Sequence, residues 1–244
     1  MYCGDQMCHT GCDTQGKIKV GAMPAGQIHL TRLQAHLESE YGWLKTTILE
    51  RDPNVSGTSV RTQLLLGFAL ERMADCPREL ILDHIVDGSS DRGIDAFYFD
   101  RPNLKAYIIQ SKYVDKPGSR PISEADAKSF AAGANEIFSL AILDYGNSRI
   151  QNLRDEIVDA VSTPGVELFP ILVSTSDKDI ADSVNIIFRN SFESSMGDPD
   201  ALRYARLSDL YQIISPYGEG GGASLSITLN GYNMVSVPFS GYYG

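Results

Sequence analysis

Hydrophobic residues recur every three or four positions near the start of the chain. Charged residues separate these apolar positions, which are Leu30, Leu33, Leu37, Tyr41, Leu44 and Ile48. This spacing predicts an amphipathic helix over residues 27–50. A turn-forming stretch ends at Gly57, and Thr58 or Ser59 is positioned to cap a second helix that runs to about residue 75. The second helix is apolar on nearly all sides, so we expect it to be buried.

The period changes to that of β-strands after residue 80. Short runs rich in Ile, Phe, Tyr and Val occupy 80–86, 94–100 and 105–112, and turn-forming sequences divide them. A further apolar run of strand length lies at 166–173. These segments predict the strands of a central sheet.

Helical patterns alternate with the strands. Ser123 is positioned to cap a helix to about residue 142, and the small alanines of its apolar stripe let it lie close against a sheet. Further helices are expected at 148–161, after Ser176 and near 198–214. The order predicts an α/β fold, with a central mixed β-sheet flanked by helices.

The two ends of the chain differ from its middle. Three of the four cysteines lie within residues 1–22, at a spacing that fits neither C-x2-C nor a paired zinc knuckle. We expect a reduced, poorly structured tail there, with a zinc site that includes His9 and His29 as the alternative. Residues 23–217 are expected to form one domain. Residues 218–244 are expected to hold a glycine linker, followed by edge strands or the start of a second domain.

Composition narrows the class of protein. The 244 residues include 31 acidic and 21 basic side chains, for a net charge of −10. No apolar run approaches the roughly 20 residues that cross a bilayer, and no secretory signal opens the chain, so we expect a cytoplasmic protein without membrane contact. The acidic balance argues against a protein that coats nucleic acid by charge alone. It leaves room for an enzyme with a carboxylate pocket and a local basic rim.

Chemically active side chains gather on two neighbouring predicted strands. Asp95 begins the first strand, and Gln110 and Lys112 end the next. Side chains two apart on a strand share a face, and in a hairpin the start of one strand lies beside the end of the other. We therefore expect a carboxylate, an amide oxygen and an ammonium to converge at one edge of the sheet.

This trio suits metal-assisted hydrolysis of a phosphodiester. Mg²⁺ prefers hard oxygen ligands, so Asp95 is the expected central ligand for Mg²⁺ or Mn²⁺, and the Gln110 side-chain or Ser111 backbone carbonyl is the second. Lys112 would orient the attacking water or stabilise charge on the phosphate. Glu71 lies on the core-facing stripe of the second helix and is a further candidate ligand; the alternative is an ion pair at the edge of that stripe.

Four residues near the motif are candidates for substrate binding. Gly93 lacks a Cβ and would let a substrate backbone approach closely. Arg92, Tyr113 and Lys116 flank the motif. Taken singly, an aspartate before a strand is commonly a turn residue, and a lysine at a strand end is commonly a solvated edge residue. Their combination with the glutamine is what indicates catalysis.

The motif resembles a known nuclease superfamily. Gly93–Ile94–Asp95 with Gln110–Ser111–Lys112 resembles the PD-(D/E)XK superfamily, in the variant where glutamine replaces the second acidic residue, as in Mrr-type restriction endonucleases. More narrowly, the chain resembles the AIPR (abortive phage infection) proteins. This resemblance rests on Asp87–Gly88, Gly93–Ile94–Asp95–Ala96, Ile109–Gln110–Ser111–Lys112–Tyr113 and the closing Pro238–Phe239–Ser240–Gly241–Tyr242–Tyr243–Gly244. The motif part of the resemblance covers roughly residues 60–175.

The resemblance implies a restriction-endonuclease-like core and a Mg-dependent nuclease of prokaryotic anti-phage defence. DNA is the expected substrate rather than RNA, with a homo-oligomer or a partner protein of a defence system. By position, Asp95, Gln110 and Lys112 match the catalytic motif, and Glu71 matches the helical acidic residue by location only. The alternatives are a catalytically inactive module that binds nucleic acid or a protein partner within a defence complex, and a structural scaffold.

Overall fold

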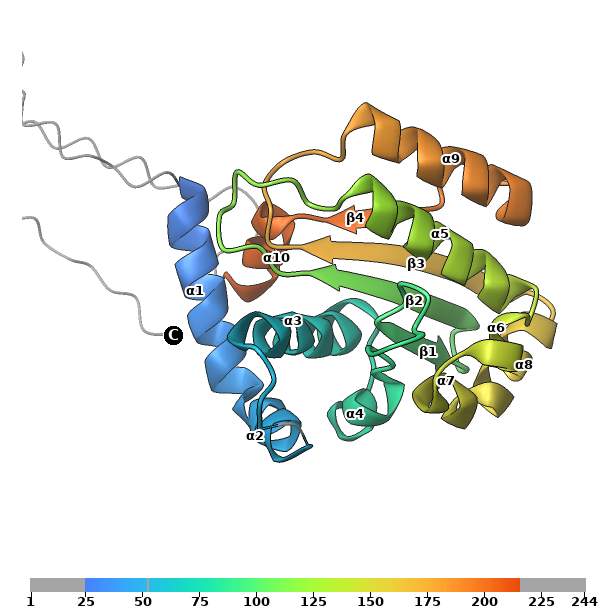
Figure 1. The fold of residues 1–244 in the computed structure, drawn as a ribbon, viewed down its shortest axis with the longest axis horizontal. Helices are drawn as coiled ribbons and strands as arrows, with labels where there is room; N and C mark the ends of the chain where they lie inside the picture. The colour runs from blue at the N-terminus through green and yellow to red at the C-terminus, as the bar shows by residue number, and fades with distance from the viewer. Residues whose placement is uncertain (1–24, 52, 216–244) are drawn as a thin grey trace, which may run out of the picture.

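A four-stranded mixed sheet forms the centre of the computed structural model, which describes residues 25–51 and 53–215. The strand order is β1 (Ala96–Asp100), β2 (Lys105–Lys112), β3 (Glu167–Ser174) and β4 (Arg203–Ala205). β1 pairs with β2 antiparallel, and β2, β3 and β4 pair in parallel (Figure 1). The expected mixed sheet is confirmed, including the place of the 166–173 run within it.

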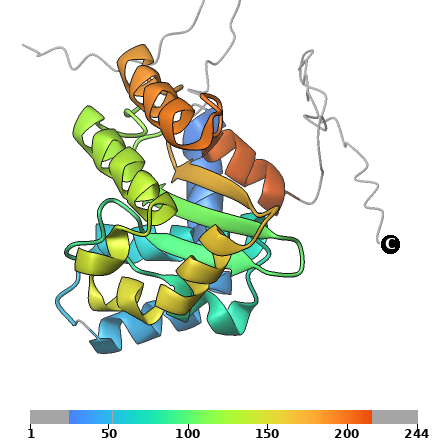
Figure 2. The ribbon, with the colours of Figure 1, turned by 90° about the vertical axis from the view of Figure 1, so that its right-hand side faces the viewer.

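Helices cover both faces of this sheet (Figure 1). The first face packs against α1 (Ala25–Glu40), α2 (Gly42–Arg51), α3 (Gly57–Met73) and α10 (Leu207–Ile214). The second face packs against α5 (Glu124–Phe138), α6 (Ile142–Tyr145), α7 (Ser148–Asn152), α8 (Arg154–Ser162) and α9 (Asp182–Met196). Figure 2 shows α5 and α9 side by side on that second face.

Side chains alternate between the two faces along β2. Tyr107 and Ile109 are buried in the core that α3 shares, whereas Ala106 and Ile108 are buried in the core that α5 shares. Burial on both sides explains why the strand reads as a continuous apolar run. The same alternation turns Gln110 and Lys112 toward the α5 face.

The first two predicted helices are present with different boundaries. The pattern over 27–50 forms two helices that meet at Tyr41, just before Gly42, because glycine disfavours a continuous helix. α3 is buried as expected, but its cap is Ser56, whose Oγ accepts a hydrogen bond from the Ser59 amide at 3.1 Å. The expected Ser123 cap of α5 is confirmed.

The predicted strand over 80–86 is wrong. Residues in this stretch form the 3-10 turn η1 (Arg78–Leu80) and the short helix α4 (Ile81–His84), with a single bridge from Ile85 to Ala96. His84 explains the helical turn, because its Nδ1 lies 2.8 Å from the Leu80 carbonyl, one turn earlier. A short apolar run does not by itself separate a strand from a buried helical segment.

Two later helices also begin later than predicted. The stretch after Ser176 becomes helical only at Asp182, and the segment near 198–214 contains β4 before α10. The predicted tail at 1–22 and the linker and strands at 218–244 lie outside the described residues. None of the helices within 25–51 and 53–215 is long and apolar enough to cross a membrane.

Candidate metal centre

Asp95 lies immediately before β1, beside the carboxyl end of β2. Its amide donates to the Ile109 carbonyl at 2.9 Å, and its own carbonyl accepts from the amides of Val86 and Asp87 at 2.8 and 3.1 Å. The antiparallel register begins with Ala96 opposite Ile109, and Asp95 lies just before it, beside the end of β2. The predicted hairpin therefore brings Asp95 close to the stretch of β2 that carries Gln110 and Lys112.

The Asp95 carboxylate is buried, with 7% of the residue exposed. One of its oxygens, Oδ2, accepts a hydrogen bond from the Ser111 amide at 2.6 Å. Burial raises the pKa of Asp95 to about 8; the Ser111 hydrogen bond opposes this shift, and the neighbouring Asp87 charge adds to it. A carboxylate in this position is costly when ionised unless a cation compensates its charge.

Two further aspartates join Asp95 in an acidic cluster. Asp87, Asp91 and Asp95 each place a carboxylate oxygen within 4.8 Å of the others. Burial raises the pKa of Asp87, and so does the charge of Asp91. The Asp87 carboxylate accepts from Gln63 Nε2 at 3.2 Å, and its backbone carbonyl accepts from Arg149 at 2.6 Å. Carboxylate oxygens gathered in this way are the donors that Mg²⁺ prefers.

Asp91 shapes the loop that carries the cluster. Its Oδ2 accepts from the Gly88 amide at 3.0 Å, and its Oδ1 accepts from the Gly93 amide at 2.8 Å. Gly93 has a φ of +76°, and a Cβ added there would lie 2.8 Å from the Phe130 amide nitrogen of α5. The space beside Gly93 is therefore filled by α5, where we expected a substrate backbone.

Gln110 supplies an oxygen that no group in the described ranges satisfies. The residue is 2% exposed, and its Oε1 has no hydrogen-bond partner there. An unsatisfied buried acceptor costs about 1–3 kcal/mol. This oxygen belongs to the residue that precedes Ser111, whose amide binds the Asp95 carboxylate. A carboxylate and an orphaned carbonyl oxygen at one place fit a divalent cation.

Lys112 lies on the same face, two residues beyond Gln110. Its Nζ is 3.3 Å from Asp126 Oδ1 on α5, and its charge opposes the rise in the pKa of Asp87 and of Asp95. Ser111 lies between the two and turns the other way, so that its Oγ lies 3.2 Å from a carbonyl of α3. The group that joins Ser111 to Asp95 is the backbone N–H.

Glu71 is not brought to the cluster. The Glu71 side chain hydrogen-bonds Tyr41 instead. Gln63 is the α3 residue that reaches Asp87, and it precedes Glu71 by eight residues, or about 12 Å along the helix axis. Glu71 therefore lies at the edge of the core-facing side of α3.

The four substrate-binding candidates are dispersed. Arg92 makes two hydrogen bonds to Glu136, at 2.9 and 2.6 Å, which commit its guanidinium to α5. Tyr113 is buried on the α3 face, where its hydroxyl donates to Gln34 at 3.3 Å. Gly93 packs against α5. Lys116 is exposed and forms no ion pair within the described part of the chain.

Four residues of the cluster were missed by sequence reasoning. Asp87 and Asp91 carried a usable signal, because aspartates recur every four residues from 87 to 95 with glycines between them. Gln63 and Arg149 carried none. They lie on α3 and α7, and only the folded chain brings those helices to Asp87.

Comparison with known proteins assigns no relative: no protein family, no curated protein and no solved structure matches this chain. The indications of function are therefore the geometry of the acidic cluster and the short motif of Asp95, Gln110 and Lys112.

Proposed function

We propose that the protein is a metal-dependent nuclease that hydrolyses phosphodiester bonds. The observation that carries this proposal is the orphaned Gln110 oxygen beside Ser111, whose amide binds the buried Asp95 carboxylate, with Lys112 on the other side of Ser111. A buried carboxylate and a buried carbonyl oxygen without a partner favour a divalent cation, and a neighbouring ammonium favours an anionic substrate.

Each residue has a distinct role in this proposal. Asp95, Gln110 and Asp87 would hold Mg²⁺ or Mn²⁺. A cation bound there would polarise the phosphate and lower the pKa of the attacking water. Lys112 would donate to a phosphate oxygen as negative charge builds up, while the ion pair with Asp126 keeps its side chain oriented before substrate binds.

The biological setting rests on the resemblance to the Mrr-type and AIPR proteins. The resemblance supports DNA rather than RNA as substrate, and a role in prokaryotic anti-phage defence by abortive infection. It also supports action as a homo-oligomer or with a partner protein. The mixed sheet with helices on both faces is compatible with a restriction-endonuclease-like core.

Cleavage assays test the proposal directly. Supercoiled plasmid DNA and a folded RNA are incubated with the protein in Mg²⁺, in Mn²⁺ and in EDTA. We expect the wild type to cut DNA in either metal and not in EDTA, and Asp95→Asn to be inactive. Glu71→Gln is the matched control, and it should retain activity because Glu71 lies away from the cluster. Equal activity of the wild type and Asp95→Asn, or no cleavage in either metal, would refute a nuclease at this site.

The alternative is a nuclease-like module that binds nucleic acid or a protein partner without cutting. The ion pair of Lys112 with Asp126 favours it, because that contact holds the ammonium on α5. In this case DNA binding would be unchanged by Asp95→Asn, and no metal would support cleavage.

A further inference from the structure

Three exposed cations gather at the carboxyl ends of β2 and β3. Lys116 and Arg120 lie in the segment that follows β2, and Lys178 lies in the segment that follows β3. None of the three forms an ion pair within residues 25–51 and 53–215. Unpaired cations at one place are notable in a chain with a net charge of −10.

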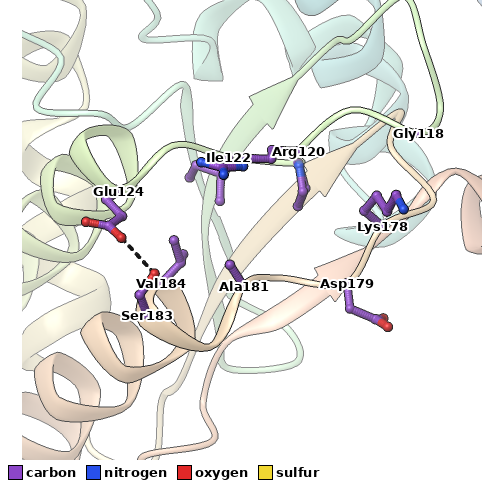
Figure 3. A pocket seen from close by; sticks show the side chains of 10 residues that line it. Gly118, Arg120, Ile122, Glu124, Lys178, Asp179, Ala181, Ser183 and Val184 are labelled. Carbon is purple, nitrogen blue, oxygen red and sulfur yellow. Dashed lines mark hydrogen bonds between the residues drawn. The ribbon is translucent and has the colours of Figure 1, made fainter.

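Two adjoining hollows lie among these cations. The larger has a volume of about 520 Å³, with Lys116 and Lys178 in its lining, and the smaller, of about 180 Å³, is lined by Arg120 and Lys178. They share Gly118 as well as Lys178, so they form one continuous depression. Figure 3 shows Arg120 and Lys178 at one end of the smaller hollow and the hydrogen bond of Glu124 with Ser183 at the other.

Carboxylates around the depression already have partners. The contacts are Asp115 with Arg61 at 2.6 Å, Asp179 with Arg206 at 2.8 Å, Asp177 with the Ser208 amide at 2.9 Å, and Glu124 with Ser183 at 2.7 Å. Asp115 and Asp179 are neutralised by arginines outside the depression, whereas Asp177 and Glu124 bond to neutral groups and keep their charge. Lys116, Arg120 and Lys178 still outnumber these two carboxylates, and none of the three cations is held in an ion pair within the described residues. A ligand for these cations is anionic and long enough to meet all three.

We propose that Lys116, Arg120 and Lys178 bind the phosphate backbone of the DNA strand that the metal centre cuts. This inference rests on the proposed function, since it states where the substrate lies. Lys116 follows Lys112 by four residues, so their Cα atoms lie at most about 14 Å apart. This upper limit corresponds to about four nucleotide steps of about 3.4 Å along the DNA axis, so one short strand can reach both. Contacts to phosphates position the strand without reading its sequence.

Salt-dependent binding tests the inference separately from cleavage. A short fluorescein-labelled DNA duplex is titrated with protein in EDTA, between about 50 and 200 mM NaCl. The test variant carries Lys116→Gln, Arg120→Gln and Lys178→Gln. The control variant carries Lys45→Gln, Lys105→Gln and Arg203→Gln, which lie elsewhere on the fold. Both variants have the same net charge, −10 − 3 = −13.

We expect the test variant to bind more weakly than the control, with a slope of log affinity against log salt that is flatter by about 2–3, because each phosphate contact contributes about 0.9 to that slope. The control should keep the wild-type slope. Equal slopes and affinities in the two variants, or no binding of the duplex by the wild type, would overturn the inference. Arg120→Lys keeps the charge and should bind as the wild type does, and a thermal melt of each variant verifies folding.

The two proposals fail in different ways. A wild type that shows this binding pattern but cuts no DNA in Mg²⁺ or Mn²⁺ retains the phosphate-binding surface and refutes the nuclease. A wild type that cuts DNA through Asp95, with a test variant that binds and cuts as the control does, retains the nuclease and refutes the surface.

Discussion

Asp95 and Gln110 are unfavourable residues for folding alone. One is a buried carboxylate beside two other carboxylates, and the other has a buried oxygen without a partner in the described ranges. Each position breaks the rule that buried polar groups are satisfied. Departures from that rule concentrate at functional sites, where a ligand completes what the protein leaves open. At the scale of single side chains, Asp95 and Gln110 are therefore the residues that most strongly indicate a functional site.

Replacing Asp95 should change how stability depends on pH. The pKa of Asp95 rises from 3.8 to about 8 on folding, so between these values the folded protein holds a proton that the unfolded chain has released. The Asp95 contribution to stability therefore falls as pH rises through that window, by at most about 1.4 kcal/mol per pH unit. In EDTA, the melting temperature of Asp95→Asn should therefore rise relative to that of the wild type as the pH increases from 5 to 8.

Asp126→Asn is the matched control for this pH series. Burial alone would raise the pKa of Asp126, but its hydrogen bond with Ser123 and the Lys112 charge outweigh burial and lower it. Its contribution to stability is therefore present above the unfolded pKa and lost in acid, the opposite sign. Parallel melting curves for the wild type and Asp95→Asn across this range would contradict the assigned pKa.

Lys112→Ala should lower the cleavage rate without unfolding the protein. The side chain is 30% exposed, and surface substitutions usually change stability by no more than about 0.5 kcal/mol. Removing a preorganised cation that acts on the transition state lowers the rate about 100- to 1000-fold. Lys105→Ala, at the opposite end of the same strand, is the control. Single-turnover cleavage and a thermal melt on one preparation measure both effects, and wild-type cleavage by Lys112→Ala would remove its catalytic role.

At the scale of elements, the acidic loop depends on a close fit with α5. Gly93 adopts a left-handed conformation where a Cβ would meet the α5 backbone, and a Cβ at Gly133 of α5 would meet the Arg92 carbonyl. Glycines on both sides of the contact let the loop and the helix approach each other. Since the loop carries Asp87 and Asp91 and leads into Asp95, the position of α5 determines the position of the cluster.

Gly93→Ala should destabilise the protein by about 2–4 kcal/mol. The left-handed conformation costs an alanine about 1–2 kcal/mol, and overpacking against α5 adds a similar amount. Gly57→Ala is the control, because nothing lies within 4 Å of a Cβ there. Denaturant unfolding measures both variants. A Gly93→Ala protein as stable as Gly57→Ala would show that the loop does not depend on this fit.

At the scale of the whole molecule, the candidate centre draws residues from several elements. α3 provides Gln63, the loop before β1 provides the aspartates, β2 provides Gln110 and Lys112, and α7 provides Arg149. Gln63 and Arg149 are far in the chain from Asp87, which they contact, so the complete set of contacts exists only in the folded protein. A cation bound there should therefore stabilise the fold as a whole.

Mg²⁺ or Mn²⁺ should raise the melting temperature of the wild type. At a metal concentration about 100-fold above Kd, binding contributes about 2.7 kcal/mol, which is about 5–10 °C for a domain of this size. The shift should be absent in Asp95→Asn and intact in Glu71→Gln. Calorimetry with and without metal measures it. An equal shift in the wild type and Asp95→Asn would place the metal elsewhere.

Local sequence pattern determined much of the sheet and part of the centre. The β1–β2 hairpin follows from two apolar runs separated by a turn, and the hairpin alone is enough to bring Asp95 beside the end of β2. The Ser123 cap and the alanine stripe likewise predicted α5. These features rest on neighbours within about 20 residues, where turn geometry and side-chain period leave few alternatives.

Only the tertiary structure decided which residues complete the centre. The periodicity of α3 showed that Glu71 faces inward, but the packing of α3 on the sheet brought Gln63 to Asp87 and left Glu71 beside Tyr41. His84 of the short helix 81–84 likewise contacts Glu156, at 3.1 Å and far away in the sequence, a contact that the local pattern of residues 80–86 does not contain. A hydrophobic pattern specifies which face of an element is buried. How far one element slides along another is set by side-chain packing over the whole interface, which no local stretch contains.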